Sequence, residues 1–140
     1  TTKRQHRNGK MNSEEPSIWN IKYFFDTYAL VEIFEGNQAY SKYVNKPFFI
    51  TLLNFFELHQ YLLRIGNEAF ADEKIEVYLQ HIQEVSPTIA LKASKFRKQH
   101  KQRNFSMADC IGYAYAKQNG LIFLTGDGAF EGMESVEFVK

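Results

Sequence analysis

Two short, largely apolar runs that each lead into an aspartate constrain the fold of this 140-residue chain most strongly. Residues 21–25 end at Asp26, and residues 121–124 are followed two positions later by Asp127. Short apolar runs of this kind are typical of strands buried on both faces of a parallel sheet. The carboxyl ends of parallel strands share one edge of the sheet, and binding sites form outside that edge. We therefore expect Asp26 and Asp127 to lie together at a site.

The segments between these runs alternate between helical and extended patterns. Apolar side chains at helical spacing predict helices over residues 27–36, 37–45, 51–65, 67–82, 86–102 and 106–119. Shorter apolar runs predict further strands over residues 48–50, 84–85 and 136–139. Strands that alternate with helices favour a three-layer α/β/α fold. We expect a mainly parallel central sheet of four or five strands, with helices on both faces.

Length and charge favour one folded domain over residues 20–140, preceded by a polar extension over residues 1–19. The first ten residues carry four basic groups, no acid and no apolar side chain, and the rest of the chain is mildly acidic. That start is interpreted as a cloning remnant ahead of Met11 or as a disordered arm. A single cysteine, Cys110, and the lack of a long apolar run favour a cytoplasmic protein without a membrane span.

The predicted helix over residues 106–119 has small side chains at every fourth position. Ala108, Gly112 and Ala116 would let this helix approach the sheet closely. Such packing would hold Asp109, in its first turn, in a fixed place. We therefore add Asp109 to the two strand-end aspartates.

The candidate site consists of four acids: Asp26, Glu57, Asp109 and Asp127. Glu57 lies near the start of the predicted helix over residues 51–65. Carboxylate oxygens are the ligands that Mg²⁺ prefers, and unpaired carboxylates gathered at one place would repel each other without a cation. The sequence therefore predicts a divalent metal site. Taken singly, each aspartate also fits a turn or a helix cap.

Glu57 has a further structural interpretation, because Arg64 and Tyr61 on its own helix are alternative partners for its carboxylate.

Four stretches carry a family resemblance, in the same order and between the expected elements. They are residues 24–30 around Asp26, 54–58 around Glu57, 106–111 around Asp109 with Ala114 and Ala116 behind it, and 124–130 around Asp127. Together they resemble a PIN domain, the nuclease fold of the VapC-type toxin ribonucleases. The resemblance spans nearly the whole folded region.

The resemblance implies a Mg²⁺- or Mn²⁺-dependent endoribonuclease in which the four acids bind the metal and water attacks an RNA phosphodiester. It further implies a homodimer and, for a toxin, a small antitoxin protein as partner. Thr125 would hydrogen-bond a ligand carboxylate or a metal-bound water, whereas Ser106 would cap its helix. Two alternatives stay open: an RNA-processing nuclease outside any toxin pair, and a catalytically silent scaffold that binds RNA or protein. A phosphotransfer enzyme with Asp26 as nucleophile is disfavoured, since Tyr28 replaces the second acid that such enzymes need.

Residues 92–103 form the main basic segment and contain no acid. Such a segment fits the backbone of a nucleic acid, but at helical spacing its charges spread around the helix and also fit a solvated face. The candidate RNA-binding residues are Lys92, Lys95, Lys98, Lys101 and Arg103.

Overall fold

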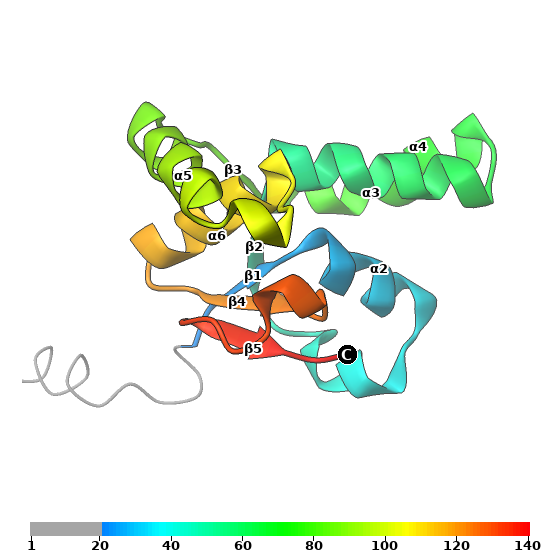
Figure 1. The fold of residues 1–140 in the computed structure, drawn as a ribbon. Helices are drawn as coiled ribbons and strands as arrows, with labels where there is room; N and C mark the ends of the chain where they lie inside the picture. The colour runs from blue at the N-terminus through cyan, green and yellow to red at the C-terminus, as the bar shows by residue number, and fades with distance from the viewer. Residues whose placement is uncertain (1–20) are drawn as a thin grey trace, which may run out of the picture.

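A computed structural model describes residues 21–140, so the predicted extension over residues 1–19 lies outside the described residues. Five parallel strands form the central sheet (Figure 1). They are β1 (Tyr23–Phe25), β2 (Phe48–Thr51), β3 (Ile82–Gln83), β4 (Ile122–Thr125) and β5 (Val136–Phe138), in the order β3-β2-β1-β4-β5. The chain leaves β1 toward β2 on one side and returns as β4 on the other. The carboxyl ends of β1 and β4 are therefore a topological switch point, the place where open α/β sheets bind ligands.

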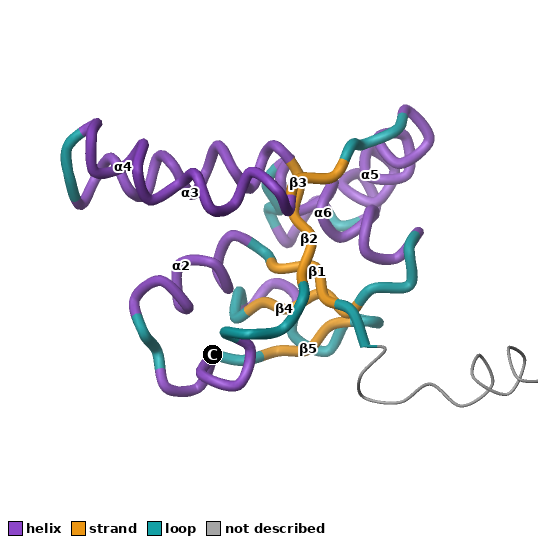
Figure 2. Tube along the Cα trace, turned by 180° about the vertical axis from the view of Figure 1, so that it is seen from behind, coloured by secondary structure: helices purple, strands orange, loops and turns teal. Residues whose placement is uncertain are grey.

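Helices cover both faces of the sheet, which confirms the predicted three-layer fold (Figures 1 and 2). One layer contains α2 (Thr27–Glu35), η2 (Gln38–Tyr43), α3 (Leu52–Ile65), α4 (Glu68–Ile75) and η3 (Glu76–His81). The other contains α5 (Pro87–Gln99), η4 (Lys101–Arg103), α6 (Met107–Gln118) and η5 (Gly128–Phe130). Helices α3 and α4 lie side by side and extend away from the sheet (Figure 1).

Side chains of the central strand supply both cores. Tyr23 and Phe25 enter the core under α2 and α3, whereas Phe24 enters the core under α5 and α6. This alternation follows from the two-residue period of a strand, and all three side chains are buried because both faces are covered. The apolar run noted in the sequence is thus explained by burial on both sides.

The predicted close packing of α6 is confirmed at Gly112. A Cβ atom added there would lie 2.8 Å from Cε1 of Phe24, so only glycine fits without a shift of the ring. Ala108 and Ala116 on the same helix are buried as well. This close approach fixes α6, and with it Asp109, against β1.

Several predicted element boundaries are wrong. Strand β3 lies at Ile82–Gln83 instead of residues 84–85, because its place is set by pairing of Ile50 with Ile82 in β2 and β3. The predicted helices over 37–45, 67–82 and 86–102 are 3-10 helical in part, as η2, η3 and η4. Apolar residues spaced by three fit α- and 3-10 helices equally, so periodicity could not separate them.

Helices long and apolar enough to cross a membrane are absent from residues 21–140.

Candidate active site at the carboxyl edge of the sheet

The structure brings the four predicted carboxylates to the switch point from four different elements. Asp26 follows β1, Asp127 follows β4, Glu57 lies in α3 and Asp109 lies in the first turn of α6. Asp109 and Asp127 both raise the pKa of Asp26, and Asp127 and Glu57 both raise the pKa of Asp109. The four groups therefore lie close enough to act on each other's charge.

Asp26 is the buried member of the cluster. Its Oδ1 accepts a hydrogen bond from the backbone N–H of Thr27 (2.9 Å), and its Oδ2 accepts one from the hydroxyl of Thr125 (2.7 Å). Burial is the main reason that the pKa of Asp26 rises to about 8, and repulsion by Asp109 adds to it. The predicted bond between Thr125 and a carboxylate of the site is thus confirmed.

The other two aspartates also cap helical turns. Asp109 Oδ2 accepts from the backbone N–H of Ser106 (2.9 Å), while the Ser106 hydroxyl accepts from the backbone N–H of Asp109 (3.0 Å). This is a capping box, as predicted for Ser106. Asp127 Oδ1 accepts from the backbone N–H of Ala129 (3.0 Å) at the start of η5.

The capping interpretation and the site interpretation of the aspartates are therefore compatible. Asp26 and Asp127 are the N-caps of α2 and η5, and Asp109 lies in the first turn of α6, so three helical N-termini converge on the cluster. Each cap fixes one carboxylate oxygen on a backbone N–H and thereby fixes the direction of the other oxygen. The positive ends of helices also favour negative charge at this edge.

Glu57 is held by a contact that the sequence did not reveal. The hydroxyl of Thr27 donates to Glu57 Oε1 (2.6 Å), and the side-chain amide of Asn54 donates to the Thr27 oxygen (3.1 Å). The predicted alternatives for Glu57 within its own helix are wrong, since Arg64 lies over the ring of Tyr61 instead.

Asn54 links this contact to the start of the same helix. It is fully buried and its Oδ1 accepts from the backbone N–H of Thr51 (3.0 Å). The sequence pattern that predicts this contact is an amide residue at the third helical position after the N-cap Thr51.

Among residues 21–140, no basic side chain forms an ion pair with the cluster. The ion pairs of the described residues join His59 to Asp72 and Lys117 to Glu134, and neither involves the four carboxylates. Half-buried or buried carboxylates that lack a protein cation are a suitable donor set for a hard divalent cation.

The spacing of the donors limits how an ion would be held. Within residues 21–140, no three acidic, histidine or cysteine side chains are placed to hold one ion together. Mg²⁺ commonly takes one or two carboxylates and keeps several waters, so the cluster fits such an ion. Ligation by all four acids stays a prediction.

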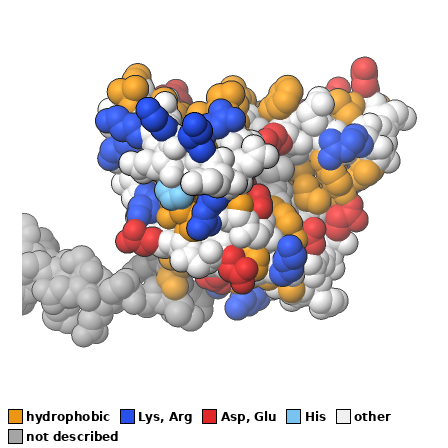
Figure 3. All heavy atoms as spheres, in the orientation of Figure 1, with side chains coloured by type: hydrophobic (Ala, Val, Ile, Leu, Met, Phe, Trp, Pro, Cys, Tyr) orange, Lys and Arg blue, Asp and Glu red, His pale blue; other side chains and the backbone are white. Residues whose placement is uncertain are grey.

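The predicted RNA-binding residues lie on the layer of α5 and α6. Lys and Arg side chains gather over α5 on the face shown in Figure 3. Lys92 bonds the side chain of Gln118, and Arg103 Nη1 donates to the carbonyl oxygen of Ala129 (2.5 Å). That second contact places η4 beside η5, two residues beyond Asp127. Whether the segment binds RNA stays a prediction.

The sequence profile of the PIN domain matches residues 23–135, which is most of the chain. The chain belongs to the PIN domain family. Among curated proteins none matches this PIN domain. The family assignment agrees with the fold and with the placement of the four acids at the switch point.

Solved structures share the fold of this PIN domain at low sequence identity. VapC20 of Mycobacterium tuberculosis, described as a sarcin–ricin loop cleaving toxin, superposes with a TM-score of 0.70 at 18% identity, covering 84% of this chain and 99% of that one. A toxin–antitoxin complex of Klebsiella pneumoniae gives a TM-score of 0.67 at 22% identity, covering 82% and 95%. VapBC2 of Rickettsia felis, bound to a promoter DNA fragment, gives 0.67 at 14%, covering 86% and 100%.

Proposed function

We propose that this PIN domain is an endoribonuclease that hydrolyses RNA phosphodiester bonds with Mg²⁺ or Mn²⁺. The observation that carries the proposal is the cluster of Asp26, Glu57, Asp109 and Asp127 at the switch point, with which no basic side chain of residues 21–140 forms an ion pair. A bound divalent cation would lower the pKa of a nucleophilic water and offset the charge that develops on the phosphate oxygens. The family assignment supports this chemistry.

The residues of the chain would hold the reacting groups in place. Asp26 and Asp109, each with one oxygen fixed by a backbone N–H, would hold the cation. Thr125 would keep the Asp26 carboxylate from rotating, and Thr27 would do the same for Glu57. Such positioning matters because misplacement of reacting groups by about 1 Å can cost about a hundredfold in rate.

Cleavage of RNA by the purified protein tests the proposal. We expect single-stranded or structured RNA to be cut with Mn²⁺ or Mg²⁺, and Asp109→Asn to reduce the rate by about a hundredfold or more, since a metal ligand would be lost. A Glu131→Gln variant, which removes an exposed carboxylate at the end of η5, is the matched control. Undiminished cleavage by Asp109→Asn would contradict the proposed site.

A non-catalytic scaffold is the second candidate. The observation that favours it is the spacing of the donors within residues 21–140, where no three ligand side chains stand ready around one point. Absence of cleavage together with RNA binding would support the scaffold and reject the nuclease.

A role as the toxin of a toxin–antitoxin pair is supported by the similar structures, which are the toxin VapC20, a VapBC2 complex and a further toxin–antitoxin complex. A small antitoxin protein would then be the partner. Inhibition of the RNA cleavage by the product of an adjacent small gene would test this, and unaltered cleavage with that product bound would contradict it.

A homodimer is the proposed assembly. Exposed apolar side chains on α3, α5 and α6 would be covered in it; they are Leu52, Phe56, Leu91 and Met107, each more than half exposed. Exposed apolar patches that are large for a monomer commonly mark protein interfaces. We expect Phe56→Asp to convert a dimer to a monomer in light scattering at micromolar concentration. A wild-type monomer would contradict the dimer.

A further inference from the structure

A cavity of about 500 Å³ lies away from the carboxylates, between α5, α6 and the loop that precedes β5. Its size is within the usual range of ligand pockets, about 300–1,000 Å³. We name it the α5–α6 pocket. Its lining residues are Lys92, Phe96, His100, Tyr113, Ala114, Lys117, Gln118, Met133 and Glu134.

Aromatic rings form much of its wall. Phe96 lies between His100 and Tyr113, with ring centroids 4.3 Å and 5.0 Å away. The Tyr113 hydroxyl donates to the carbonyl oxygen of Glu134 (2.6 Å), which ties the wall to the loop before β5. A cavity with several fixed rings suits a flat aromatic group, and a nucleobase gains affinity by stacking on such rings.

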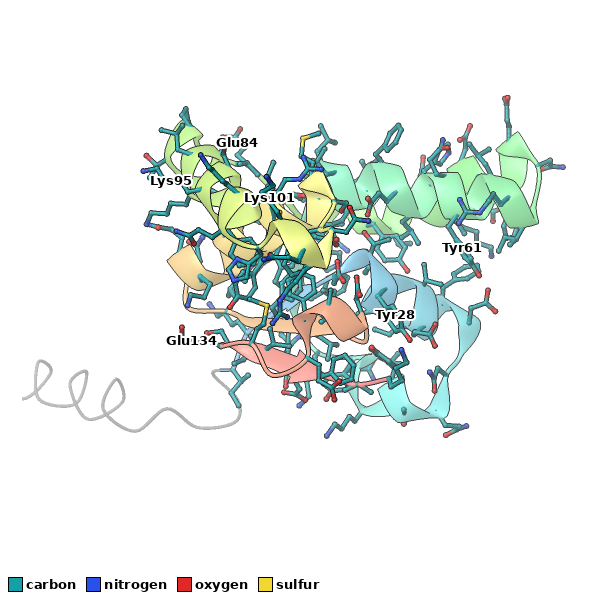
Figure 4. The ribbon with its side chains drawn as sticks, viewed as in Figure 1. Tyr28, Tyr61, Glu84, Lys95, Lys101 and Glu134 are labelled. Carbon is teal, nitrogen blue, oxygen red and sulfur yellow. The ribbon has the colours of Figure 1, made fainter. Side chains whose placement is uncertain are left out.

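Cationic groups stand at the rim of the same pocket. Lys92 and Lys117 reach it from α5 and α6, and Lys117 shares its charge with Glu134 (2.5 Å). Figure 4 shows α5, which carries Lys95, above the loop before β5 that carries the lining residue Glu134. Fixed rings beside lysines form the combination that binds a base together with its phosphate.

A second, smaller cavity adjoins this pocket at His100. It measures about 200 Å³, is lined by Arg97, Lys101, Asn104 and Phe105, and shares His100 with the α5–α6 pocket. The bond from Arg103 to Ala129 places η4 beside the turn that follows Asp127. Arg97 and Lys101 therefore add cations beside the α5–α6 pocket, and residues 92–103 contain no acid to oppose them.

We propose that the α5–α6 pocket binds one nucleobase of a single-stranded RNA whose flanking phosphates lie on Lys92, Arg97 and Lys101. This inference rests on the proposed function, because the RNA is taken to be the substrate of the carboxylate site. The pocket would select substrates with an unpaired base at a fixed distance from the cleaved bond. The residues that line the pocket, none of which is one of the four acids, would then determine which RNA is cleaved.

The pocket can be tested without cleavage. A ¹⁵N-labelled protein in EDTA is titrated with a five-nucleotide single-stranded RNA, with uridine and adenosine monophosphates, and with inorganic phosphate. We expect the RNA to shift the backbone amides of Phe96, His100, Tyr113 and Met133, and inorganic phosphate to leave them in place. We also expect the RNA to bind about tenfold or more tightly than either mononucleotide, since it reaches further cations.

Three results would overturn the proposal: RNA shifts confined to the carboxylate site, equal shifts with inorganic phosphate, or equal affinities for RNA and a mononucleotide. Cleavage without shifts in the pocket would reject the pocket alone. Shifts in the pocket without cleavage would reject the nuclease alone.

Two variants separate the pocket from general attraction of a basic surface. Lys92→Glu changes a lining residue, whereas Lys95→Glu makes the same charge change on the same helix outside the lining set. We expect the first to weaken RNA binding by at least about threefold more than the second, since diffuse attraction alone would affect both alike. His100→Ala removes a ring and should weaken binding about tenfold, as loss of base stacking does. Equal effects of the two lysine variants would contradict a pocket.

Discussion

Asp26→Asn should make the metal-free protein more stable at neutral pH, although it removes a site residue. Burial and the neighbouring Asp109 raise the pKa of Asp26 from 3.8 to about 8. The folded protein binds the proton of the Asp26 carboxyl more tightly than the unfolded chain does. The stability that this proton contributes is therefore complete below pH 3.8 and is lost as the pH rises toward 8. Asparagine keeps an oxygen for the N–H of Thr27 and carries no titrating proton.

The size of the expected gain in unfolding free energy follows from the same shift in the pKa of Asp26. Between pH 3.8 and pH 7 the unfolded carboxyl is ionised and the folded one stays largely protonated, over a span of about three pH units. At about 1.4 kcal/mol per unit, the wild-type protein loses about 4 kcal/mol of unfolding free energy that Asp26→Asn keeps. The expected gain is of this order at pH 7 and near zero at pH 4.

Urea unfolding in EDTA from pH 4 to pH 8 measures the difference between the two proteins. Glu131→Gln, which changes an exposed carboxyl, is the control and should follow the wild type. A constant difference between Asp26→Asn and the wild type across this range would refute the argument that Asp26 is a strained, buried acid. Added Mn²⁺ should stabilise the wild type and leave Asp26→Asn nearly unchanged, because a ligand that binds the folded state raises its stability.

Two further substitutions test how the site is built. Gly126→Ala would place a Cβ atom 2.3 Å from the carbonyl oxygen of Val139, so the main chain must move, and we expect a loss of about 2–3 kcal/mol in unfolding free energy. The control Gly128→Ala, whose Cβ would have no atom within 4 Å, should cost less than about 1 kcal/mol. Equal losses of the two variants in thermal unfolding would contradict the close packing at Gly126. Thr27→Val removes the hydroxyl that donates to Glu57, and we expect it to weaken Mn²⁺ binding about tenfold in calorimetry. Loss of a hydrogen bond to a metal ligand commonly lowers metal affinity by about tenfold to a hundredfold. An unchanged affinity would show that Glu57 does not contribute to metal binding.

The strand-end aspartates were predictable because their positions follow from local patterns. Apolar runs covered on both faces identify β1 and β4, and the parallel arrangement then places Asp26 and Asp127 at one edge. The cap of α6 was predictable for the same reason, since Ser106 and Asp109 are three residues apart in one helical turn.

Contacts between distant segments were not predictable. Thr27 meets Glu57 only because the start of α2 lies beside α3 in the folded sheet, 30 residues later in the chain. The two residues of β3 have no strand pattern of their own, and pairing with β2 alone defines them. Within residues 21–140, the lack of an ion pair to the carboxylates likewise depends on where the lysines and arginines of that part are placed, which periodicity does not reveal.

The proposed function requires that the carboxylates at the switch point hold a divalent cation. Anomalous diffraction from crystals of the protein grown with Mn²⁺ would locate such an ion. We expect a Mn²⁺ peak with a carboxylate oxygen of Asp26 and one of Asp109 or Asp127 at about 2.0–2.3 Å, the distance range for hard cations of this size. A protein that shows no Mn²⁺ at this edge, or Mn²⁺ bound only elsewhere, would contradict the account.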